Sequence, residues 1–102
     1  MKTRLAEPAR RDARRMQRWW KANRPKAPKL FALELAEARQ HIADKPHIGQ
    51  VYAVRAGSIV VRRVLMPKTR THLFYEVQEE EDLAMIVALW GATKEHGPDI
   101  DR

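Results

Sequence analysis

Basic and titratable side chains gather in one stretch of the sequence, where they could support chemistry on a phosphate. The stretch contains Arg62, Arg63, Lys68, Arg70, His72 and Tyr75. RNA can be cleaved through its own 2′-hydroxyl without a metal, provided that a base, an acid and cations surround the charged phosphorane. One hypothesis is therefore a metal-independent endoribonuclease, with the candidate catalytic residues Arg62, Arg63, Arg70 and His72.

The alternation of side chains along a β-strand limits how many of these residues can act together. Successive side chains of a strand point to opposite faces of the sheet. Arg62 and Arg63 must therefore separate, and so must His72 and Tyr75, because an odd number of positions divides each pair. At most half of the candidates can share a site. The alternative is that they are ordinary exposed strand positions, with a tyrosine packed at the sheet edge.

Other kinds of catalytic or cofactor site find little support. The four histidines, at positions 41, 47, 72 and 96, form neither an i, i+4 pair nor an HExxH motif. The absence of cysteine excludes a catalytic thiol and a disulfide framework, and it fits a reducing cytoplasm. Ser58 lacks a nucleophile elbow. We therefore expect no metal and no cofactor.

Positive charge is concentrated in the first third of the chain. Residues 1–29 contain eleven Lys or Arg but only two acidic residues, Glu7 and Asp12. Such a potential favours a polyanionic partner, either nucleic acid or an acidic protein segment. The candidate contacts lie on one predicted helix face and are Arg11, Arg14, Arg15 and Arg18. The alternative is a solvated face that keeps the protein soluble.

Two amphipathic helices are predicted before residue 49. The first begins at Pro8 and ends near Asn23, because the residue before Pro25 is pushed out of the helical region. The second begins at Pro28 and is closed by Lys45, Pro46 and Gly49. Apolar stripes recur at spacings of four, three and four, through Ala9, Ala13, Met16 and Trp20, and through Phe31, Leu35, Ala38 and Ile42. We expect Trp20, Phe31, Leu35 and Ile42 to be buried and Trp19 to be partly exposed.

Beyond Gly49 the composition changes to Val, Ile and aromatic residues, which indicates strands. The predicted strands are Val51–Val54, Ser58–Leu65, Thr71–Val77 and Leu83–Trp90, with Thr3–Leu5 as a short edge strand. The eight apolar residues Leu83–Trp90 fit an interior strand and fall far short of the roughly 20 that span a bilayer, so no membrane partner is expected. The predicted fold is a single two-layer α+β domain, residues 1–102, with an N-terminal helical hairpin on a small, mainly antiparallel sheet.

The order of these elements and several short strings resemble the RelE/ParE toxin family. The strings are Pro8–Asp12, Lys45–Gly49, Val61–Leu65, His72–Val77 and Ile86–Gly91, within a match over about residues 2–98. The resemblance implies the toxin of a type II toxin-antitoxin system, neutralised in a hetero-oligomer by a cognate antitoxin. The implied target is DNA gyrase, or messenger RNA on the ribosome.

Particular positions divide the two branches of that family. Ribonuclease members usually carry an arginine three positions before the tyrosine of the Leu-Phe-Tyr string, where this sequence has His72. They also tend to place an arginine, and often a tyrosine, after the last strand, where this chain has Lys94 and His96. The resemblance therefore favours a ParE-like gyrase poison, with target-binding residues Trp90, Lys94 and His96. A RelE-like ribosome-dependent mRNA endoribonuclease and a basic nucleic-acid-binding module remain the alternatives, so the sequence leaves open whether the protein is an enzyme.

Overall fold

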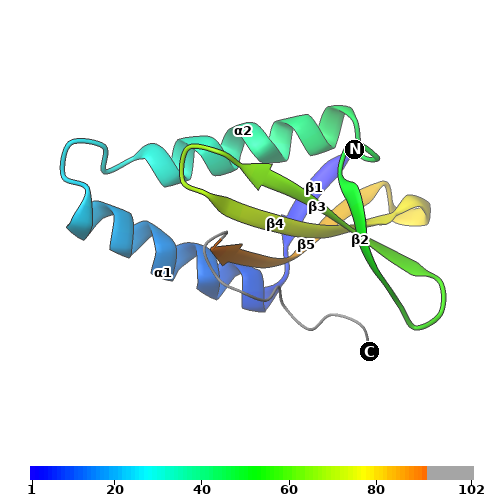
Figure 1. Cartoon of the computed structure of the whole chain (residues 1–102). Coiled ribbons are helices and arrows are strands. Elements are labelled where there is room, and N and C mark those ends of the chain that lie inside the picture. The colour runs from blue at the N-terminus through cyan, green and yellow to red at the C-terminus, as the bar shows by residue number, and fades with distance from the viewer. Residues whose placement is uncertain (92–102) are drawn as a thin grey trace.

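Two helices and five strands make up the part of the chain described by the computed structural model, residues 1–91. In chain order they are β1 (Lys2–Leu5), α1 (Glu7–Asn23), α2 (Leu30–Asp44), β2 (Gln50–Arg55), β3 (Ile59–Met66), β4 (Thr71–Gln78), the short 3₁₀ turn η1 (Glu79–Glu81) and β5 (Leu83–Gly91). The helices run in opposite directions along the sheet (Figure 1). The predicted α+β fold is confirmed. Within residues 1–91, neither helix has the length and apolar character needed to cross a membrane.

The strands form one mixed sheet in the order β1-β5-β4-β3-β2. Only β1 pairs in parallel, with β5, and the remaining neighbours are antiparallel. The short edge strand and the interior position of the last strand are as predicted. A register shift lies between Val51 and Ala53 in β2, and another between Phe74 and Tyr75 in β4.

Helix α1 begins as predicted but buries less of its apolar stripe than expected. Pro8 lies in the first turn, and the Arg24 N–H bonds to the Trp20 carbonyl at 2.9 Å where the helix ends. Ala9 is fully buried and Trp19 is 48% exposed, as predicted, whereas Trp20 is only half-buried. Trp20 lies in the last turn of α1, beside the β3–β4 turn at the end of the sheet. It therefore packs at the edge of the core, not in its centre.

Helix α2 begins two residues later than predicted. Pro28 lies in a turn, where the Ala27 N–H bonds to the Arg24 carbonyl and the Leu30 N–H to the Ala27 carbonyl. These consecutive turns delay the helix. Phe31 and Ile42 are fully buried as expected, whereas Leu35 is half-buried at the margin of the same core.

A buried carboxylate joins α2 to the β3–β4 turn. Glu34 is 5% exposed, and its oxygens accept the backbone N–H groups of Lys68 at 2.6 Å and Thr69 at 2.9 Å, together with the Thr69 hydroxyl at 2.7 Å. A carboxylate that loses its water must find such donors inside the protein. The two segments, more than thirty residues apart in sequence, are thereby fixed against each other.

Candidate functional site

The two faces of the sheet divide the candidate catalytic residues. In the β3–β4 register Arg62 lies opposite Tyr75, on the face that the helices cover. Arg63 lies opposite Phe74, on the other face. Alternation predicted this separation, and likewise the separation of His72 from Tyr75. We call the second side, which the two described helices do not cover, the open face.

Arg62 and Tyr75 stabilise the fold on the helix-covered side. The buried Tyr75 hydroxyl accepts the Gly49 N–H at 3.0 Å and donates to the Pro46 carbonyl at 2.7 Å. Arg62 Nη1 donates to the Gly49 carbonyl at 2.8 Å. A Cβ on Gly49 would lie 2.9 Å from the Tyr75 hydroxyl, so glycine is needed for this approach. Gly49 thus serves tertiary packing, since α2 already ends at Asp44.

Arg70 is separated from the other candidates as well. It is an exposed residue of the β3–β4 turn with a φ of 54°, the left-handed region. Its side chain lines a hollow with Trp19 and Trp20, whereas Arg63 and His72 line a different one. The four predicted catalytic residues therefore do not converge on one site.

Arg63, His72 and Trp90 do share the open face, in an aromatic cluster. In the β4–β5 register Trp90 lies directly opposite His72. The Arg63 guanidinium lies 5.8 Å from the centroid of the Tyr52 ring, and Tyr52 meets Phe74 edge to face at 4.6 Å between centroids. We call these five residues, Tyr52, Arg63, His72, Phe74 and Trp90, the open-face cluster. It joins candidates that the sequence had assigned to two different roles.

The surroundings of His72 in this cluster favour its neutral form. Burial, and then the positive charge of Arg63, lower the pKa of His72 from its ordinary value. Its Nδ1 atom is buried and has no hydrogen-bond partner within the described residues. A histidine whose pKa is lowered carries a proton less often at neutral pH, so it is less suited than an ordinary histidine to act as the acid of a nuclease. Among residues 1–91 the other candidates, Arg62 and Arg70, lie elsewhere.

A shallow hollow of about 420 Å³ adjoins the cluster at the level of His72. Its lining is apolar at Ile48 and Leu65 and basic at Arg63, whose Nη2 donates to Gln50 Oε1 at 3.2 Å. Ile48 is 54% exposed and Leu65 is 51% exposed. Exposed apolar side chains beside a cation are typical of a surface that binds a protein partner.

A partly buried ion pair lies at the Glu76 end of the open face. Arg55 donates to both carboxylate oxygens of Glu76, at 2.9 and 3.0 Å, and Glu76 is 3% exposed. The hydrogen bond and the charge of Glu76 raise the pKa of Arg55. Gln78 donates a further bond to Glu76 at 3.1 Å. Because its oxygens are engaged in this way, Glu76 is not a free general base.

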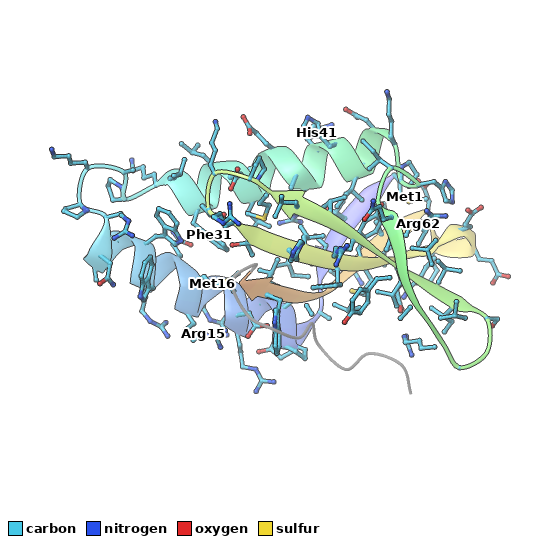
Figure 2. The ribbon with its side chains drawn as sticks, in the orientation of Figure 1. Met1, Arg15, Met16, Phe31, His41 and Arg62 are labelled. Carbon is cyan, nitrogen blue, oxygen red and sulfur yellow. The ribbon has the colours of Figure 1, made fainter. Side chains whose placement is uncertain are left out.

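The predicted polyanion-binding arginines all lie on the exposed surface of α1. Arg14 pairs with Glu7 at 3.7 Å and Arg15 with Asp12 at 3.1 Å, whereas Arg11 and Arg18 form no ion pair within the described residues. Figure 2 shows Arg15 pointing away from the sheet and Met16 toward it. Exposed ion pairs are weak, and this helix contains six basic residues but only two acidic ones. α1 therefore keeps a strong positive potential.

Sequence reasoning missed two members of the open-face cluster. Phe74 could have been found, because it is two residues from His72 on the same strand and alternation places it on the same face. Tyr52 could not, because the register shift between Val51 and Ala53 determines its direction. Of the predicted target-binding residues, Lys94 and His96 lie outside the described residues. Within residues 1–91, no group of three or more His, Cys, Asp or Glu side chains could hold a metal ion.

Comparison with known proteins places this arrangement in a family. A family profile described as the ParE toxin of the type II toxin-antitoxin system, parDE, matches residues 3–95. The toxin-antitoxin complex RelBE of E. coli contains a chain that is similar in structure, with a TM-score of 0.60 and 12% identity, covering 91% of this chain and 98% of that one.

The isolated E. coli RelE toxin is similar to the same degree. Its TM-score is 0.59 with 12% identity, over 93% of this chain and 87% of that one. At such identity the likeness shows the fold alone, and no curated protein sequence matches the chain significantly. The profile match spans nearly all of the sequence, so the chain belongs to the ParE toxin family of type II toxin-antitoxin systems.

Proposed function

We propose that this toxin is ParE-like in action: in the cytoplasm it binds and poisons DNA gyrase, and a cognate antitoxin neutralises it in a hetero-oligomer. In this proposal the toxin performs no chemical step of its own. Its effect spreads over a binding surface that includes the open-face cluster and the end of β5. The family match supports a ParE-like mode of action.

The observation that carries this proposal is the separation of the candidate catalytic residues. Arg62 is bound to the Gly49 carbonyl on the helix-covered side, and Arg70 lies in a turn that lines a different hollow. Metal-free RNA cleavage needs cations and two proton-transfer groups at one phosphate. The open face offers Arg63 and a His72 of lowered pKa among aromatic rings, which suits binding better than proton transfer.

The antitoxin is proposed to approach α1 through charge and to be held by apolar burial. Arg11, Arg14, Arg15 and Arg18 give this helix a positive surface that steers an acidic segment. Exposed apolar side chains then supply the contact area that persists when salt screens the charges. If moderate salt dissociated the toxin-antitoxin complex completely, the apolar part of this proposal would be wrong.

The test is to express the chain in cells while the antitoxin is withheld. We expect double-strand breaks with gyrase trapped on the DNA, and no early change in messenger RNA ends. Trp90→Ala should reduce toxicity, because it truncates a large ring at the centre of the proposed surface. Deletion of residues 92–102 should abolish toxicity more completely than the double substitution Arg70→Ala and His72→Ala.

A RelE-like endoribonuclease is the second candidate, and one observation favours it. Arg63 and His72 share a face and a hollow, so a cation and a base are at least adjacent. In that case the same experiment yields rapid cleavage of messages at ribosome-bound codons. Arg63→Ala together with His72→Ala should then stop the cleavage while the fold and antitoxin binding persist.

A further inference from the structure

The last turn of α1 and the β3–β4 turn border a second hollow, on the other side of the sheet from the open-face cluster. Its volume is about 350 Å³, and it opens to solvent. Its lining includes Trp19, Trp20, Arg24, Lys68, Arg70 and Thr71. The Thr71 position belongs to the helix-covered side of the sheet, opposite the open-face cluster. The hollow therefore lies on the other side of the sheet from the open-face cluster, and it meets the surface proposed to bind gyrase only at Gly91, the end of β5.

Two tryptophans and an arginine form an aromatic corner in this hollow. The rings of Trp19 and Trp20 meet at 72° with their centroids 5.6 Å apart. The guanidinium of Arg24 lies 5.3 Å from the centroid of Trp19 and 5.8 Å from that of Trp20. Trp19 remains 48% exposed. A large aromatic surface is thus presented to solvent beside a cation.

The charged residues that line the hollow all carry the same sign. They are Arg24, Lys68 and Arg70, and within the described residues none of them forms an ion pair. The nearby carboxylate of Glu34 is 5% exposed, does not line the hollow, and accepts three hydrogen bonds from the β3–β4 turn. Among residues 1–91, the charged side chains around this aromatic corner are therefore all positive.

We infer that this hollow binds single-stranded nucleic acid, with one unpaired base stacked on Trp19 and its phosphates beside Arg24, Lys68 and Arg70. Stacking on aromatic side chains within a positive groove is the general mode of single-strand binding, because every base has a π-face. Further phosphates can follow the basic surface of α1, where Lys21 and Arg18 continue the positive charge.

The same features fit an acidic peptide less well. A peptide that binds as an added strand needs free N–H groups on its receptor, but those of Lys68 and Thr69 are already donated to Glu34. A peptide anchor gains most in a pocket that excludes water, and this hollow opens to solvent beside a half-exposed ring. A flat base needs only the ring and the cations.

Titration of the full-length chain with labelled single strands of about 12 nucleotides tests the inference, since known sites span roughly 4 to 16 nucleotides. Oligo(dT) and oligo(U) serve as separate probes that distinguish DNA from RNA, and a duplex of equal length is the competitor. Fluorescence anisotropy measures affinity, and quenching of tryptophan emission reports stacking. We expect either single strand to quench the emission and to bind more tightly than the duplex.

Matched variants assign the effect to the hollow. Trp19→Ala should weaken binding about tenfold or more, whereas Trp19→Phe should retain much of the affinity, because a ring remains for stacking. Arg24→Gln and Lys68→Gln should each lower the salt dependence by about one charge. Lys45→Gln, which removes the same charge at the end of α2, is the control and should change affinity less.

Three results would overturn the inference. The first is an absence of binding, or binding of the duplex as tightly as the single strand. The second is an affinity of Trp19→Ala equal to that of the unmodified chain, which would show that α1 attracts the strand by charge alone. The third is that the Trp19 and Lys68 substitutions weaken binding of the cognate antitoxin but not of the oligonucleotides, which would make the hollow a peptide site.

Discussion

Neighbouring residues of the same strand have different surroundings on the two faces of the sheet. On the helix-covered face Leu73 and Tyr75 are fully buried, and the tyrosine hydroxyl is matched to backbone partners. On the open face Phe74 is equally buried, but it meets the ring of Tyr52 edge to face and lies beside the half-buried His72. The helix side thus fixes the fold, while the open side keeps a cation and an imidazole near solvent.

The comparison explains why a cluster of candidates in the sequence becomes two unrelated groups in the protein. Arg62 and Arg63 are neighbours in β3, yet one holds the Gly49 segment and the other lies against Tyr52. A basic residue in a strand is therefore structural or functional according to its face. Substitutions on the two faces should therefore separate an effect on stability from an effect on toxicity.

The largest effect is expected in the core beneath the helices. Phe31→Ala should lower the free energy of unfolding by about 3 to 5 kcal/mol, through lost burial and the cavity left behind. Leu65→Ala on the open face, where the leucine is 51% exposed, should change it by less than about 0.5 kcal/mol. Urea unfolding measures both. Equal losses at the two positions would contradict the assignment of the core to the helix side.

The next effect concerns the Tyr75 hydroxyl. Tyr75→Phe leaves the Gly49 N–H and the Pro46 carbonyl without their partner and should lower stability by about 1 to 3 kcal/mol. Toxicity per folded molecule should stay the same, because the hydroxyl faces the interior. A variant with unchanged stability and lost toxicity would instead place this hydroxyl in the functional site.

A smaller effect is expected from the ion pair of the open face. Arg55→Gln leaves the buried Glu76 carboxylate without its guanidinium and should cost about 1 to 2 kcal/mol, reduced because the Arg55 side chain is 33% exposed. Thermal unfolding of this variant and of Arg14→Gln gives the comparison. The Arg14 pair is exposed on both sides and should contribute almost nothing. Similar losses of stability in both variants would show that the burial of Glu76 does not make its ion pair with Arg55 stronger than an exposed pair.

The smallest effect is a dependence of stability on pH. Because the native pKa of His72 is lowered by burial and by Arg63, the unfolded chain binds this proton first as pH falls below about 6.5. Stability should therefore decline on acidification from neutral pH until the native imidazole is itself protonated. His72→Gln should flatten this part of the profile. A decline of the same size in that variant would assign it to other groups.

Much of the fold could be predicted from the sequence, because it depends on local patterns. Alternation separated Arg62 from Arg63, and the breaks at Pro25 and Pro46 limited both helices. Contacts between distant segments could not be predicted in the same way. In the sequence Glu34 looks like an ordinary exposed helix residue. Its role depends on the β3–β4 turn, where the Lys68 N–H donates to its carboxylate. Trp20 follows the apolar stripe of α1, yet its burial depends on where the sheet ends.

The site was predicted less completely, for a related reason. Pattern alone identifies the face of a residue but not its neighbours across strands, which depend on register. The pairing of His72 with Trp90 joins a nuclease candidate to a target-binding candidate, and the shift in β2 adds Tyr52. The pattern within each strand therefore identified candidate residues of the open-face cluster, but it could not show that residues of different strands meet.

The central claim, that the open face binds a target and performs no cleavage, is tested most directly with purified components. The full-length chain is added to DNA gyrase and, separately, to ribosomes translating a defined message, with Arg63→Ala together with His72→Ala as the comparison. We predict that the unmodified chain traps gyrase on cleaved DNA, that the double variant binds gyrase more weakly, and that the message stays intact with both. Cleavage of the message at ribosome-bound codons by the unmodified chain, lost in the double variant, would contradict the claim.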